Sequence, residues 1–191
     1  MTKKEIRQEI KSKKEKLTTD NIAEKSEIMT GHFTGLTEYK NCRQIILYAA
    51  FNQEVDTLPL INQALEEGKK VALPKVTKGG LEFFYIRSFQ ETAISNMGIP
   101  EPDTSNPVEL LTDGLNVILV PGLAFDLEGN RIGYGRSYYD AYFAAHRAEF
   151  MKIAFAYDFQ VYDRIPSEKH DVKIDLLITD TFSRKFTCRY A

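Results

Sequence analysis

The glycine-rich segment at residues 129–140, GNRIGYGRSYYD, has the residue types of an anion-binding turn. It follows an apolar run and leads into a helical pattern, so the N-terminus of a helix adds partial positive charge. Gly133 and Gly135 let the backbone turn its N–H groups inward. Arg131 and Arg136 can add charge-assisted hydrogen bonds. The pattern predicts a phosphate site, and the alternative is a tight turn that needs glycine for steric reasons only.

Several common catalytic motifs are missing around this segment. A Gly-x-Gly-x-x-Gly motif would need glycine at position 138, which is Tyr138, and no Gly-Lys-Ser/Thr follows. The chain has no Gly-x-Ser-x-Gly, and its three histidines have no partner at ligand spacing. The sequence therefore argues against a dinucleotide fold, a P-loop, an acyl-transfer nucleophile and a histidine-based metal site.

Carboxylate side chains lie at the end of the glycine-rich segment and at the ends of other predicted strands. Asp140 lies about one turn into the helix, where a hard cation such as Mg²⁺ would find a carboxylate beside phosphate oxygens. The alternative is an acid favoured by the helix dipole. Asp126 and Asp175, at strand ends, are second candidates for a metal or hydrogen-bond role.

Two further acidic residues follow another apolar run, residues 44–50. Glu54 can recognise a heterocycle rich in N–H groups, since a carboxylate accepts hydrogen bonds with both oxygens. Asp56 with Thr57 is better explained as a helix cap. We therefore rank Glu54 above Asp56 as a binding residue.

The elements that must position these side chains alternate between strand and helix. A strand, a helix near Pro59 to Gly68 and a second strand form a βαβ unit, which implies parallel pairing. We expect an α/β fold in which helices sandwich a mainly parallel sheet, as a single domain over residues 1–191. The expected strands are 44–50, 70–74, 81–86, 116–121, 151–156, 175–179 and an edge strand at 182–188, with a loop at 95–107 and a helix at 137–147.

The start of the chain is basic and helical. Residues 1–16 contain seven basic and three acidic side chains. Ile6, Ile10, Lys13 or Lys14, and Leu17 recur at helical spacing, and this apolar stripe is thin. Such a helix is often a solvated face, but it can also cover an anion. A second helix is expected to begin at Asn21, with a capping box to Glu24.

Composition places limits on the function. The chain has 191 residues, 27% of them charged, and a net charge of −2, which argues against a dedicated nucleic-acid binder. The two cysteines are far apart and suit free thiols in a reducing compartment. No apolar run approaches the length of a membrane span, and the start lacks a signal peptide. We expect a monomeric cytoplasmic protein with neither nucleic-acid nor membrane partners.

Residues 120–140, VPGLAFDLEGNRIGYGRSYYD, resemble the signature of the 5-formyltetrahydrofolate cyclo-ligase family, also called methenyltetrahydrofolate synthetases. The resemblance extends over nearly the whole chain. Further segments match in the same order: residues 3–7 (KKEIR), 48–57 (YAAFNQEVDT), 71–75 (VALPK), 98–102 (GIPEP) and 170–175 (HDVKID).

The resemblance implies a reaction and a set of site residues. Members of the family use MgATP to convert 5-formyltetrahydrofolate into 5,10-methenyltetrahydrofolate, ADP and phosphate. By position, the implied ATP contacts are Lys3, Lys4, Arg7, Ile132, Gly133, Tyr134, Gly135, Arg136, Ser137, Tyr138, Tyr139 and Asp140. The implied substrate contacts are Ala49, Glu54 and Tyr138, the metal-side positions are Asp140 and Asp175, and the catalytic positions are Arg136, Tyr138 and Asp140.

The loop departs from the family at one point. Many members have further glycines where this chain has Arg136 and Ser137. We expect the Ser137 hydroxyl to cap the helix and Arg136 to bridge phosphate oxygens; the alternative is that Arg136 points to solvent. Two other functions stay open: an enzyme that binds a phosphosugar without ATP, and a non-catalytic folate- or nucleotide-binding protein.

Overall fold

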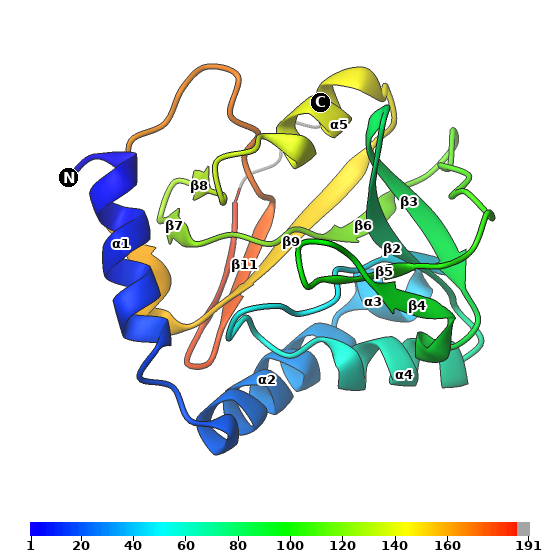
Figure 1. The fold of residues 1–191 in the computed structure, drawn as a ribbon, viewed down its shortest axis with the longest axis horizontal. Coiled ribbons are helices and arrows are strands. Elements are labelled where there is room, and N and C mark those ends of the chain that lie inside the picture. Colours follow the sequence, from blue (N-terminus) through cyan, green and yellow to red (C-terminus); the bar gives the residue numbers. More distant parts are fainter. Residues whose placement is uncertain (187–191) are drawn as a thin grey trace.

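The computed structural model describes residues 1–186, and its centre is a seven-stranded sheet in the order β12-β11-β9-β6-β1-β2-β3 (Figure 1). Strand β1 pairs in parallel with β2 and β6, and β9 pairs in parallel with β6 and β11. Only the edge strands β3 and β12 are antiparallel to their neighbours. The strands are β1 (Gln44–Ile46), β2 (Lys70–Thr77), β3 (Gly80–Ile86), β6 (Asn116–Leu119), β9 (Phe150–Ala156), β11 (Leu176–Thr179) and β12 (Ser183–Lys185). The mainly parallel α/β sheet is confirmed.

Both faces of the sheet are covered because side chains alternate along each strand. Ile45 packs in one core with Met29 and Leu60, whereas Ile46 packs in another with Tyr142. Helices α2 and α4 therefore cover one face, and α5 covers part of the other (Figure 1). The helices are α1 (Lys3–Lys14), α2 (Thr19–Thr34), α3 (Thr37–Asn41), α4 (Leu58–Glu66) and α5 (Tyr138–Ala145), with 3₁₀ turns η1 (Phe89–Glu91) and η2 (Asp158–Gln160).

A small sheet covers the rest of the second face. It has the order β10-β7-β8, and Phe125 packs on Ala154 and Leu177 of the central sheet. A hairpin of two short strands lies beside β2 and β3. These strands are β4 (Thr92–Ile94), β5 (Pro100–Pro102), β7 (Ala124–Asp126), β8 (Arg131–Ile132) and β10 (Val161–Tyr162).

Helix α1 docks on the small sheet. Ile6 and Ile10 are fully buried with Leu123, Ile132 and Ile165. The apolar stripe of α1 is thin, as expected, but both isoleucines are completely covered. The helix is therefore part of the packed structure and not a solvated appendage.

Several predicted boundaries were wrong. The second helix begins at Thr19 with Thr18 as its cap, and Asn21 closes the capping box at the position assigned to Glu24. The strand expected at 44–50 ends at Ile46, with a last ladder bond from the backbone N–H of Leu47 to the carbonyl oxygen of Ala72, and the loop at 95–107 contains β5. The last part of the strand expected at 182–188, including Cys188, lies outside the described residues; Cys42 is a free thiol.

The helices of residues 1–186 lack the length and apolarity that a bilayer span requires. The longest, α2, has 16 residues, and no helix in this range could cross a membrane.

Candidate active site

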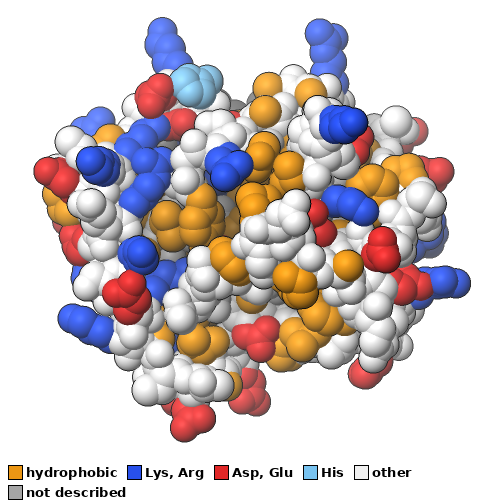
Figure 2. Space-filling view, in the orientation of Figure 1, with side chains coloured by type: hydrophobic (Ala, Val, Ile, Leu, Met, Phe, Trp, Pro, Cys, Tyr) orange, Lys and Arg blue, Asp and Glu red, His pale blue; other side chains and the backbone are white. Residues whose placement is uncertain are grey.

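A cavity of about 310 Å³ opens beside the C-terminal end of β1. Most of its lining comes from five segments: α1, residues 48–54, parts of β2 and β3, the hairpin β4–β5, and the glycine loop with the start of α5. Pro121 and Asp171 complete it. In Figure 2 apolar side chains fill the hollow and Lys and Arg side chains gather along one side. A pocket with an apolar body and a few converging polar groups is the usual form of a small-molecule site.

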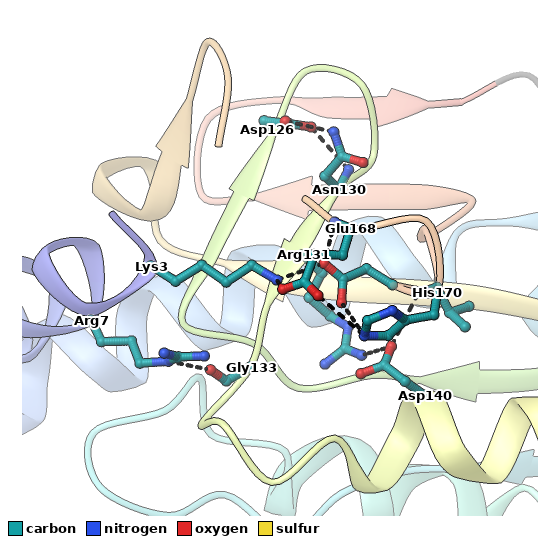
Figure 3. A network of polar contacts seen from close by, with 11 residues as sticks. Lys3, Arg7, Asp126, Asn130, Arg131, Gly133, Asp140, Glu168 and His170 are labelled. Atoms are coloured by element: carbon teal, nitrogen blue, oxygen red, sulfur yellow. Dashed lines mark hydrogen bonds and ion pairs between the residues drawn. The ribbon is translucent and has the colours of Figure 1, made fainter. Parts of the chain in front are cut away.

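The glycine loop lies against α1. The Nε of Arg7 donates to the carbonyl oxygen of Gly133 at 2.9 Å (Figure 3). Gly135 has a φ of +96°, and a Cβ there would meet the Arg7 guanidinium at 3.6 Å. That distance is an ordinary van der Waals contact, so glycine is needed at this position for its backbone conformation.

The start of α5 differs from the expectation in one respect. Ser137 occupies the N-cap position, but it has a φ of 51° and its side chain makes no capping hydrogen bond. The prediction that its hydroxyl holds the turn was wrong, because a left-handed residue turns the hydroxyl away from the helix N–H groups. Arg136 is exposed and lines the cavity. Ile132, Tyr134 and Tyr138 also line the cavity.

Lys3 reaches the cavity from the first turn of α1. Its ammonium lies 2.8 Å from Asp171 and 2.9 Å from Glu168 (Figure 3). Burial acts to lower the pKa of Lys3, but these two carboxylates raise it above its usual value. Lys4 is exposed and does not line the cavity, so the structure brings together Lys3 and Arg7 but leaves Lys4 outside.

Asp140 forms a buried ion pair at the base of the loop. Its Oδ1 accepts from Arg131 at 2.9 Å and from the backbone N–H of Val172 at 3.1 Å. No described residue bonds its other oxygen, Oδ2. The Nε of Arg131 is buried and lacks a hydrogen-bond partner among the described residues. Sequence reasoning ranked Arg136 above Arg131, because it could not show that Asp140 anchors Arg131.

Glu54 forms the opposite wall of the cavity. Its Oε1 accepts from the Tyr134 hydroxyl at 2.5 Å and its Oε2 from the backbone N–H of Phe51 at 2.9 Å. Asn52 and Gln53 both have φ near +50°, which non-glycine residues adopt at a cost. The strained turn directs Glu54 into the cavity, and burial raises the pKa of its carboxyl above 4.5.

Neighbouring residues have separate roles. Asp56 accepts from the backbone N–H of Leu58 at the start of α4, which confirms its assignment to the helix start. Thr57 occupies the N-cap position, but its hydroxyl donates to the carbonyl of Tyr48. Ala49 is buried in the cavity lining. Tyr139 lines the cavity too, and its buried hydroxyl has no partner in residues 1–186.

The two implied metal-side aspartates lie apart. Asp175 lines a second cavity and pairs with Lys152 at 2.7 Å, so it does not join Asp140. Asp126 is fully buried and accepts from Asn130 and Ile165, which gives it a structural role. Within residues 1–186 no three His, Cys, Asp or Glu side chains form a metal-binding group. Of the two implied metal-side aspartates, only Asp140 lines the first cavity, whose other carboxylates are Glu54, Glu101 and Asp171.

Comparison with known proteins adds independent information. The family model described as the 5-formyltetrahydrofolate cyclo-ligase family matches residues 1–180. The probable 5-formyltetrahydrofolate cyclo-ligase of Caenorhabditis elegans is 31% identical, over 92% of this chain and 91% of that protein. The 5-formyltetrahydrofolate cyclo-ligase of Mus musculus is 28% identical, over 91% of each chain.

Two solved structures have the same fold as this chain. The NMR structure of Aquifex aeolicus 5,10-methenyltetrahydrofolate synthetase has a TM-score of 0.86 and 32% identity, covering 100% of this chain and 96% of that one. A synthetase structure from Mycoplasma pneumoniae, at 24% identity and a TM-score of 0.75, shares the fold. The family model covers far more than half of the chain, and the fold agrees with it. The chain belongs to the 5-formyltetrahydrofolate cyclo-ligase family.

Proposed function

We propose that this protein converts 5-formyltetrahydrofolate and ATP into 5,10-methenyltetrahydrofolate, ADP and phosphate. The proposal rests on one observation: a cationic wall and a largely apolar wall line the same cavity. Lys3, Arg7 and the glycine loop form a cationic wall suited to a triphosphate, and Glu54 stands in the other, largely apolar wall. Membership of the family supports the same reaction.

The reaction needs positioning more than a protein nucleophile. The formyl oxygen attacks the γ-phosphorus of ATP, the bond to the β-phosphate oxygen breaks, and ADP leaves. The neighbouring amine nitrogen then attacks the formyl carbon, loses its proton to solvent and closes the ring, and phosphate departs with the former formyl oxygen. Holding the reactants in line and neutralising charge accounts for most of such catalysis.

The cationic wall is proposed to hold ATP. Lys3 and Arg7 lie one helical turn apart and face the same cavity. Arg136 and Tyr138 project from the loop at the start of α5, where backbone N–H groups favour anions. Arg131 lies beneath the loop, and its buried Nε–H has no hydrogen-bond partner among the described residues. These groups orient the phosphates and balance the charge that develops during transfer.

Mg²⁺ fits this site at one position. Asp140 uses Oδ1 for Arg131 and Val172, and its Oδ2 is available to a cation. Mg²⁺ commonly uses one or two carboxylates together with phosphates and water, so one protein ligand suffices. When bound, the ion would neutralise phosphate charge. Asp175 is not included, because it lines the second cavity.

The proposal is tested by a direct assay. The methenyl product has an extended chromophore, so its absorbance can be followed in the near ultraviolet. We expect the absorbance to rise only when 5-formyltetrahydrofolate and MgATP are both present. A rise without ATP would contradict the proposal. No rise, with folate or nucleotide still bound, would indicate a non-catalytic binding protein, and phosphosugar turnover alone would indicate the remaining alternative. Residence in the cytoplasm and a monomeric state stay predictions.

Replacing Lys3 and Arg7 together by alanine should weaken ATP binding by at least about 100-fold. Each lost charge-assisted contact costs about 1.5–3 kcal/mol. The fold should survive, since α1 is anchored by Ile6 and Ile10 and not by these head groups. Calorimetric titration with ATP measures the effect. The double variant Lys11→Ala with Lys16→Ala removes the same charge from exposed positions and serves as the control. Equal ATP affinity in both double variants would remove α1 from the proposed ATP site.

A further inference from the structure

Lys14, at the C-terminal end of α1, is a lysine in a buried position. Ile6, Ile10 and Lys14 follow each other at four-residue spacing, so they share the face of α1 that packs inward. Lys14 is only 4% exposed. Lysine is rarely buried to this degree unless its charge is balanced. Within residues 1–186, however, no hydrogen bond or ion pair holds its ammonium group.

The fold brings this end of α1 towards the turn that carries Glu54. Helix α1 packs against η2, and Tyr157 immediately precedes η2. The Tyr157 hydroxyl donates to the backbone carbonyl of Glu54 at 3.1 Å. In the view of Figure 1 the segment between β1 and α4 reaches towards the side of the molecule on which α1 lies. Helix α1, η2 and the strained turn therefore pack one against the next, with Phe159 of η2 against the cluster that contains Ile6 and Ile10.

The charges in this unit are coupled. Burial lowers the pKa of Lys14, and the Glu54 carboxylate acts in the opposite direction. Burial raises the pKa of Glu54, and the Lys14 ammonium acts against that rise. Each group would lose its charge more readily without the other, because burial disfavours the charged form of both.

The other groups that face Glu54 cannot replace Lys14. Cations on the opposite side of the cavity are Lys3, Arg7, Arg131 and Arg136, but Lys14 is the cation that counters the rise in the Glu54 pKa. The remaining groups are four phenols from four different segments: Tyr48, Tyr134, Tyr139 and Tyr157. Burial raises the pKa of all four phenols, so they are neutral at physiological pH. A neutral phenol can donate one hydrogen bond, but it carries no charge to offset a carboxylate.

We propose that Lys14 is a positioning residue for folate, which acts through Glu54 by keeping its carboxylate ionised inside the cavity. The inference rests on the proposed function, in which Glu54 faces the pterin. The pterin ring offers a ring N–H and an amino group as donors. An ionised carboxylate accepts with both oxygens and has about four lone-pair sites, of which Tyr134 and Phe51 use two. A protonated Glu54 would present an O–H to those donors and lose the match.

The test measures folate binding without ATP, so that it does not depend on turnover. Calorimetric titrations with 5-formyltetrahydrofolate are made across the pH range below and above neutrality. Four proteins are compared: wild type, Lys14→Met, Lys14→Arg and Lys11→Met. Methionine keeps the buried stem of Lys14 without its charge, and arginine keeps the charge. Lys11 is exposed in the last turn of the same helix and is the matched control.

We expect folate binding to weaken on the acid side in every protein, with the acid limb of Lys14→Met about one pH unit higher than that of wild type. In Lys14→Arg the acid limb should return most of the way to its wild-type position, and in Lys11→Met it should match wild type. ATP affinity should be the same in all four proteins, because Lys3 and Arg7 are unchanged.

Three results would overturn the inference. They are an unmoved acid limb in Lys14→Met, a limb that Lys14→Arg does not restore, and a parallel loss of ATP affinity, which would show that α1 has shifted. If Lys14→Met does not fold, Lys14→Gln compared with Lys14→Arg makes the same test. A wild-type protein that binds no folate would instead refute the proposed function.

Discussion

Replacing Asp140 by asparagine is expected to reduce turnover by at least about 100-fold, equivalent to about 2.7 kcal/mol of transition-state stabilisation. Asparagine keeps the shape and an acceptor oxygen for Arg131 and Val172, but it removes the negative charge. Two costs follow. The Arg131 guanidinium loses its charged partner, which lowers the free energy of unfolding by about 1.5–3 kcal/mol. In addition, Mg²⁺ loses the carboxylate oxygen proposed to bind it. Part of the lost activity should therefore return at high Mg²⁺ concentration.

The control for Asp140→Asn is Asp175→Asn. Asp175 also pairs with a largely buried cation, Lys152, but it lies outside the first cavity. Thermal melting and a Mg²⁺ titration are measured on both variants. Both should lose stability, and only Asp140→Asn should need more Mg²⁺. If the Mg²⁺ dependence of Asp140→Asn equals that of wild type, Asp140 serves only as the partner of Arg131.

Replacing Glu54 by glutamine should lower kcat/KM for 5-formyltetrahydrofolate by at least about 100-fold. Two hydrogen bonds from pterin N–H groups to a carboxylate would each contribute about 1.5–3 kcal/mol. Glutamine can keep the contacts to Phe51 and Tyr134 by presenting its oxygen to the N–H and its amide to the phenol. The loss should therefore appear in folate KM and kcat/KM, while ATP affinity is unchanged. Asp56→Asn changes an acid two residues away that serves the start of α4, and it should bind folate normally.

The pH profile gives a second measure of Glu54. Burial raises the pKa of this carboxyl above 4.5. Activity that needs the ionised form is complete above the raised pKa and is lost as the pH falls through it. The acid limb of kcat/KM for folate should therefore lie above the range of an ordinary glutamate. In Glu54→Gln, which has no proton to lose at this position, the limb should disappear; a limb that persists would assign it to another group.

The sheet could be predicted from sequence because its strands are short apolar runs between helical patterns. Ile45, Val71 and Val117 all lie in such runs, and parallel pairing follows from the helical connection. The small sheet could not be predicted, since β8 and β10 have two residues each and no periodicity. Propensity also failed to show where β1 stops, because the apolar run continues to Ala50, whereas the last backbone hydrogen bond to β2 comes from the N–H of Leu47.

The site was predictable in its chemistry but not in its contacts. Glycines, arginines and a carboxylate in one segment indicated phosphate and metal, and Glu54 had no evident structural reason to be an acid. The polar contacts between distant segments could not be predicted: Asp171 with Lys3, Val172 with Asp140, and Tyr134 with Glu54. The spacing put Lys13 or Lys14 on the stripe with Ile6 and Ile10, but the burial of Lys14 could not be predicted, because it lies in a run of basic residues.

The docking of α1 has a consequence for how the protein reaches its native state. A helix of 12 residues is marginal alone, and Ile10 has no core until Leu123 and Ile165 are in place. Contacts this distant in the chain form late, because the intervening loop must first be closed. We expect an early species in which the central sheet is formed while α1 is loose. A nucleotide held between α1 and the glycine loop would bind only the finished state, and ATP would thus assist its own enzyme's folding by mass action.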